Sequence, residues 1–136
     1  MAELLKQFLK DTITKEFEWG QCDCGLWVCD WIELNTGEDP GKDLRGTYTT
    51  ELGCGKLLVK SKGVEGLLAD RIPPLADRVY GRNALGDIAV IDMPNVGAAL
   101  TLRTPIGWAV KNMGNGYTVY GPINIRFAWR LKCLQQ

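Results

Sequence analysis

The sequence contains no histidine among its 136 residues. A chain without imidazole cannot by itself supply the general base of a Cys-His or Ser-His hydrolase, or a histidine ligand to a metal. The chain also lacks an excess of one charge, because 16 Lys and Arg residues balance 16 Asp and Glu residues. Proteins dedicated to nucleic-acid binding normally carry a basic excess, so we expect no nucleic-acid partner.

Long hydrophobic runs are missing as well. No apolar stretch approaches the roughly 18 residues of a membrane-spanning helix, so we expect no membrane span. Residues 1–10 have the pattern of an amphipathic helix and no small-residue cleavage site, which differs from a signal peptide. We therefore expect synthesis in a cytoplasm, where thiols stay reduced.

The composition is that of a globular protein, with 46% hydrophobic and 24% charged residues, and the length suits one domain over residues 1–136. Hydrophobic spacing in the first half predicts helices over 2–12, 24–34, 49–60 and 64–69. Short apolar or alternating runs in the second half predict strands over 88–91, 98–103, 106–111, 117–120 and 125–133. This order predicts an α+β fold in which N-terminal helices pack on a C-terminal, mostly antiparallel sheet.

The segment 125–133 has the most regular alternation in the chain. Its odd positions are apolar and comprise Ile125, Phe127, Trp129, Leu131 and Cys133. Its even positions are Arg126, Ala128, Arg130 and Lys132. Because side chains alternate across a strand, this pattern predicts one buried face and one solvated, basic face.

Five cysteines occur in the chain, namely Cys22, Cys24, Cys29, Cys54 and Cys133. The first three lie close together, so a metal or iron–sulfur site is one alternative. In a helix that begins at Cys24, the side chains of Cys24 and Cys29 project about 140° apart, and the chain has no CxxC pair or histidine. The spacing therefore favours thiols buried as small apolar side chains, and we expect no cofactor.

The segment 19–27, with the sequence WGQCDCGLW, places a cysteine at the start of an apolar helix. Cys24 would lie in the first turn, where the partial positive charge of the helix N-terminus lowers a thiol pKa and favours thiolate. Asp23 suits the N-cap of this helix, and its charge would oppose thiol ionisation unless it is used for capping. The pattern indicates Cys24 as a candidate nucleophile that faces the sheet.

The W-G-x-x-D-C pattern resembles the NlpC-type cysteine peptidase superfamily, which has a papain-like fold. It is most similar to a compact branch of this superfamily found in tail gene modules of long-tailed bacteriophages. Three further segments resemble that branch, in the same order along the chain: residues 36–48, 85–90 and 127–130. The resemblance extends over residues 15–132.

The resemblance implies that the family's nucleophile corresponds to Cys24. The family's histidine corresponds to Asn95, before Val96 and Gly97, and we expect Asn95 to lie near Cys24. An amide is not basic, so Asn95 cannot accept the proton of a thiol. The family's third polar residue, which orients the histidine, has no match at any of three candidate positions, Thr104, Lys111 and Asn112.

These departures imply a catalytically inactive protein of the phage tail tip or of tail assembly. It would be made in the host cytoplasm, delivered in the virion and bound to other tail-tip proteins, with peptidoglycan as a further partner. Two alternatives stay open. One is an active, peptidoglycan-cleaving thiol hydrolase that uses Cys24 during genome entry, with Asp23 or a partner's group as base. The other is a cysteine-based metal or iron–sulfur tail component.

Overall fold

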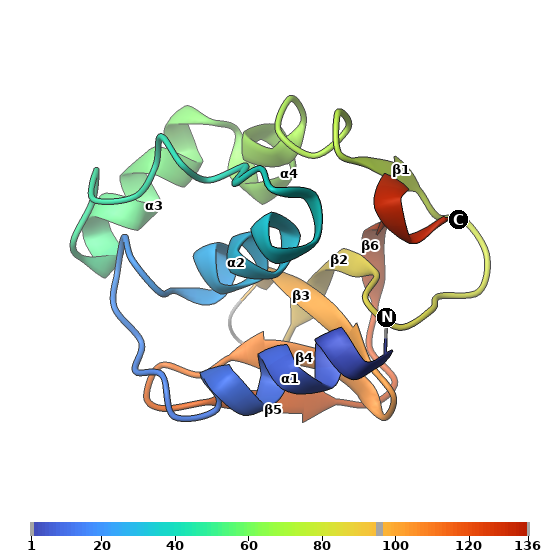
Figure 1. Cartoon of the computed structure of the whole chain (residues 1–136). Helices are drawn as coiled ribbons and strands as arrows, with labels where there is room; N and C mark the ends of the chain where they lie inside the picture. The colour runs from blue at the N-terminus through green and yellow to red at the C-terminus, as the bar shows by residue number, and fades with distance from the viewer. Residues whose placement is uncertain (1, 95–96, 136) are drawn as a thin grey trace.

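The computed structural model describes residues 2–94 and 97–135, and within them the chain is α+β (Figure 1). The helices come first: α1 (Ala2–Thr12), α2 (Cys24–Thr36), α3 (Glu51–Lys60) and α4 (Gly63–Leu68). The strands follow: β1 (Ala76–Arg78), β2 (Ile88–Met93), β3 (Gly97–Thr104), β4 (Gly107–Lys111), β5 (Tyr117–Tyr120) and β6 (Ile125–Leu131). They form one sheet in the order β1-β6-β2-β3-β4-β5, and each neighbouring pair is antiparallel.

The predicted α+β class is confirmed, with helices before an antiparallel sheet, and three details of the prediction need correction. Helix α3 begins at Glu51 with Thr50 as its N-cap, rather than with Thr49. Strand β1 was not predicted, because three residues are too few to show an alternating pattern. Strand β6 ends at Leu131, and the exposed Cys133 lies in a short 3-10 helix.

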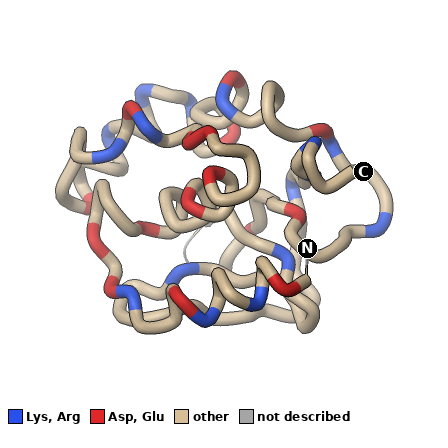
Figure 2. The backbone as a smooth tube through the Cα atoms, viewed as in Figure 1, with Lys and Arg blue, Asp and Glu red and all other residues tan. Residues whose placement is uncertain are grey.

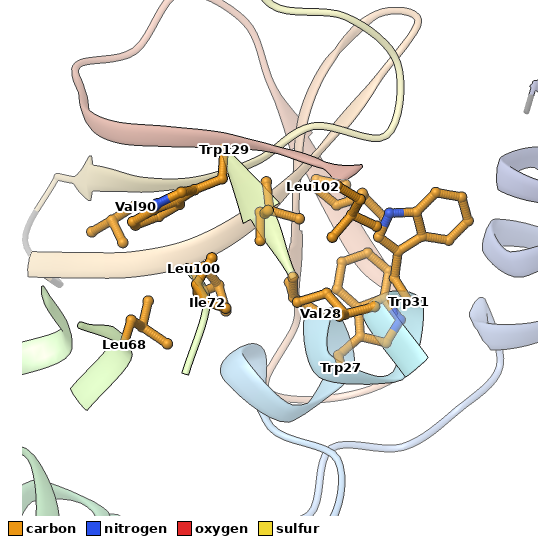
Figure 3. Packing of buried hydrophobic residues seen from close by; sticks show 14 of the residues in the cluster. Trp27, Val28, Trp31, Leu68, Ile72, Val90, Leu100, Leu102 and Trp129 are labelled. Atoms are coloured by element: carbon orange, nitrogen blue, oxygen red, sulfur yellow. The ribbon is translucent and has the colours of Figure 1, made fainter. Parts of the chain in front are cut away.

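One face of the sheet packs against α1 and α2. Trp27 and Trp31 of α2 are fully buried, and Phe8 of α1 lies against both rings with centroid distances of 5.5 and 5.4 Å. Figure 3 shows the tryptophans beside Val28 of the same helix and Leu102 of β3. Burial of one large apolar side chain stabilises a fold by roughly 1.5–3 kcal/mol, so these contacts hold α2 firmly on the sheet. Among the described residues, no helix combines the length and the apolar character that a membrane crossing requires.

The second face of the sheet is also largely apolar. Its buried cluster consists of Ala89, Ile91, Ala99, Trp108, Val110 and Ala128. The predicted solvated row on β6 is therefore wrong at Ala128, which is 4% exposed. Two basic members of that row are ion-paired, Arg126 with Asp92 and Arg130 with Asp87.

Gly86 and Asp87, which precede β2, bind side chains of α2 and of β6. The Trp31 indole N–H donates a hydrogen bond to the Gly86 carbonyl at 3.1 Å. Asp87 is fully buried, and its carboxylate accepts two hydrogen bonds from Arg130 at 2.9 Å each and one from the Ala84 N–H. Because a buried carboxylate needs a paired charge and hydrogen-bond donors, this arrangement makes Asp87 a structural residue.

Replacing Asp87 with Asn should lower the free energy of unfolding by about 2–3 kcal/mol, because the Arg130 guanidinium loses its carboxylate. The matched control is Asp43→Asn, since the Asp43 side chain is 68% exposed and also pairs with an arginine, Arg71. The control should cost less than about 1 kcal/mol. Urea unfolding followed by tryptophan fluorescence measures both variants, and equal losses would contradict the structural role of Asp87.

Candidate functional site

Cys24 is the first residue of α2, as the sequence predicts. The helix begins there because Asp23, in an extended conformation, caps it by accepting the Leu26 N–H at 3.0 Å. Cys24 is partly buried, and its side chain packs against buried apolar residues of the sheet. This contact agrees with the prediction that the residue faces the sheet.

The Asp23 carboxylate is 3% exposed and accepts three hydrogen bonds. Besides the Leu26 N–H, it accepts the Gly20 N–H at 3.2 Å and the hydroxyl of Tyr48. The loop before α2 and the loop before α3 thus meet at one side chain. These bonds commit the carboxylate to capping and loop attachment rather than to proton transfer.

The surroundings of Cys24 raise its thiol pKa instead of lowering it. Burial is the main cause and the charge of Asp23 is the next, and the pKa rises from 9.0 to about 12. The N–H groups of Cys24 and Gly25 at the helix start act in the opposite direction but more weakly. Burial and the neighbouring carboxylate thus outweigh the lowering of the pKa that the helix start alone would produce.

Tyr48 and Cys54 join the site although the sequence assigned neither of them a role there. Burial, followed by its hydrogen bond to Asp23, raises the pKa of Tyr48. Burial and then the charge of Asp23 raise the pKa of Cys54, and the nearby Tyr48 side chain acts in the opposite direction. No local sequence pattern brings these two residues to Asp23, which lies 25 or more positions earlier in the chain.

Arg45 fastens the loop that carries Tyr48. Its guanidinium donates hydrogen bonds to the carboxylates of Asp39 and Asp30, both at 2.7 Å, and to the Gln21 carbonyl at 3.0 Å. Burial alone would lower the pKa of Arg45, but the two carboxylates raise it, so the side chain stays charged. This network holds residues 37–48 against α2 and keeps Tyr48 within reach of Asp23.

The other residues considered for a catalytic triad do not add a base to this geometry. Asn95, expected near Cys24 in place of a histidine, lies outside the described residues. Thr104 donates to the Gly107 carbonyl within a turn, and Asn112 accepts from Thr118. Lys111 is 4% exposed, and its ammonium donates to three backbone carbonyls of the turn between β4 and β5. Each of these described side chains is used in local structure.

The cysteines are all free thiols, and Cys22 and Cys29 are buried. Burial raises the pKa of both, to about 12 for Cys29. Metal binding needs thiolates, so these surroundings oppose it. Within residues 2–94 and 97–135, no group of three or more Cys, Asp or Glu side chains is placed to hold a metal ion.

A small cavity of about 60 Å³ adjoins the site. Asp23, Gly25 and Tyr48 contribute to its lining, and apolar side chains from α2, α4 and β3 supply most of the rest. Ligand pockets usually measure roughly 300–1,000 Å³, so this space suits a small aliphatic group and not a peptidoglycan strand.

A family model described as a domain of unknown function (DUF6950) matches residues 1–131. No curated protein and no solved structure matches the chain.

At pH 8, Cys24 should react with iodoacetamide about 10³-fold more slowly in the folded protein than after unfolding in urea, because each unit of pKa changes the thiolate fraction tenfold. The exposed Cys133 serves as an internal control and should react at similar rates in both states. Peptide mass analysis of timed samples measures each cysteine separately. Labelling of folded Cys24 as fast as that of Cys133 would contradict the raised pKa.

Asp23→Asn should make folded Cys24 react faster at fixed pH. The amide keeps an oxygen for the Leu26 N–H but removes the negative charge that opposes the thiolate, so the pKa of Cys24 falls. Asp11→Asn, an exposed change at the end of α1, is the matched control and should leave the rate unchanged. If Asp23→Asn leaves the pH profile of labelling unchanged while the protein stays folded, the carboxylate does not influence the thiol.

Proposed function

The chain belongs to the DUF6950 family, and we propose that this protein is a papain-like domain without hydrolytic activity that serves in a bacteriophage tail tip or in tail assembly. The segments that resemble the phage tail branch of the NlpC-type superfamily support the tail role. The order of helices before an antiparallel sheet agrees with a papain-like relationship. Under this proposal the protein acts in the virion, and its partners are other tail-tip proteins.

The observation that carries the loss of hydrolysis is the chemistry around Cys24. The residue occupies the helix start at which papain-like enzymes place their nucleophile, but its pKa is about 12. The charged group that affects it most is Asp23, which is negative and opposes ionisation. A thiol hydrolase needs a thiolate near neutral pH or a base that forms it. Cys24 therefore has the position of a nucleophile, but its surroundings do not favour the thiolate.

The active-hydrolase alternative rests on the same helix start, where backbone N–H groups could stabilise an oxyanion. Its candidate base within the chain, Asp23, already accepts hydrogen bonds from Gly20, Leu26 and Tyr48. A base from a partner chain is the route by which this alternative could still operate. The inactive domain is the better supported of the two proposals, because it requires no such addition.

Purified protein should release no soluble fragments from insoluble peptidoglycan, and Cys24→Ser should give the same result. An active NlpC-type hydrolase serves as positive control, and the assay is repeated with purified tail particles in case a partner supplies the base. The protein itself should be present in those particles at a fixed copy number, measured by quantitative mass spectrometry. Fragment release that disappears with Cys24→Ser would overturn the loss of hydrolysis, and absence from the particles would overturn the tail role.

A further inference from the structure

The outer face of α3 is apolar and uncovered. The structure describes all residues of α3, and none of them is buried. Leu52 and Val59 point outward and are 69% and 83% exposed. The inner face of the helix attaches it to the site, since Gly53 lies against Tyr48 and Cys54 is close to the same side chain.

The outer face contains a notch of the kind that helices use to pack together. Leu52, Gly55, Lys56 and Val59 follow one another at positions i, i+3, i+4 and i+7, which enclose the hole that accepts one side chain of a facing helix. A Cβ atom added at Gly55 would meet nothing within 4 Å, so the side of the notch that Gly55 forms is open. The open groove over it measures about 700 Å³ and is lined by residues of α3.

One side of the notch carries positive side chains and the other side carries a negative one. By helical spacing, Lys56 and Lys60 lie on one side of the apolar face and Glu51 on the other, and Lys62 follows the helix. Figure 2 shows Lys and Arg positions in blue in the part of the chain where Figure 1 places α3. A partner with acidic side chains next to its apolar residues is complementary to this surface. A second copy of the chain in an antiparallel, two-fold pairing would instead bring the lysines of both helices to the same side.

The sequence of α3 also indicates that the helix needs a partner to pack against its outer face. The helix has ten residues and two interior glycines, Gly53 and Gly55, each of which costs roughly 1 kcal/mol relative to alanine. Isolated helices of this length are marginal in water. A facing helix that buries Leu52 and Val59 would supply the apolar contact that α3 lacks.

We propose that the outer face of α3 is a docking groove for an acidic amphipathic helix of a partner protein, with one apolar side chain of that helix seated at Gly55. This inference deepens the proposed function and rests on it, because it gives a noncatalytic domain its binding surface. Binding of a synthetic helix to α3 can be measured without thiol chemistry or peptidoglycan. A lack of such binding is therefore distinguishable from failure of the proposed function.

The test uses the full chain and a fluorescein-labelled synthetic helix with leucines at heptad a and d positions and glutamates beside them. A second peptide has lysines in place of the glutamates. Fluorescence anisotropy measures affinity, and ¹H–¹⁵N chemical shifts locate the contact. We expect saturable binding of the acidic peptide, shifts centred on residues 51–60, and much weaker binding of the basic peptide.

Two variants test the groove itself. The double change Lys56→Glu and Lys60→Glu should weaken acidic-peptide binding roughly tenfold, because exposed ion pairs are replaced by repulsion. The matched control is Lys6→Glu with Lys10→Glu on α1, which has the same spacing and should leave binding unchanged. Gly55→Leu fills the notch in open space and favours the helix, so it should abolish binding while the fold persists.

Four outcomes would overturn the proposal. The first is the absence of saturable binding, and the second is binding that the Lys56 and Lys60 reversal leaves unchanged. The third is self-association in analytical ultracentrifugation that Gly55→Leu removes, because the face would then be an interface between copies. The fourth is sedimentation with phosphatidylcholine–phosphatidylglycerol vesicles that depends on the same residues, because the groove would then be a membrane-binding surface.

Discussion

The arrangement around α2 depends on the carboxylate of Asp23. It caps the helix through the Leu26 N–H, holds the preceding loop through the Gly20 N–H and holds the next loop through the Tyr48 hydroxyl. A buried carboxylate is stable only when donors of this kind surround it. Since α2 also carries Trp27 into the centre of the core, the helix start, the two loops and the main apolar contact are joined at one side chain.

The same carboxylate explains why Cys24 differs from a catalytic thiol. The partial positive charge at the start of α2 is balanced by a negative side chain one residue away, which leaves less of it to stabilise a thiolate. Burial acts in the same direction, and the pKa of Cys24 rises to about 12. The position typical of a nucleophile is therefore combined with electrostatics that favour a neutral, packed thiol.

Features that depend on neighbours in the chain could be predicted from the sequence. Alternation over 125–133 predicted β6, which ends two residues earlier at Leu131, and an aspartate before an apolar run predicted the cap of α2. Features that depend on distant contacts could not be predicted. Tyr48 meets Asp23 because Arg45 fastens the intervening loop, and Ala128 is buried by packing on the second face of the sheet. The pKa of Cys24 likewise follows from burial, which spacing rules do not measure.

Helix α3 relates this site to the proposed docking groove. Its inner face brings Cys54 close to Asp23 and Tyr48, and its outer face carries the notch at Gly55. A short helix with two glycines has little stability of its own, so its position depends on the contacts of both faces. A partner helix in the notch would stabilise α3 and, through it, the contact between Tyr48 and Asp23. Docking would then strengthen the arrangement that keeps Cys24 protonated, so binding and the loss of thiol chemistry are physically compatible.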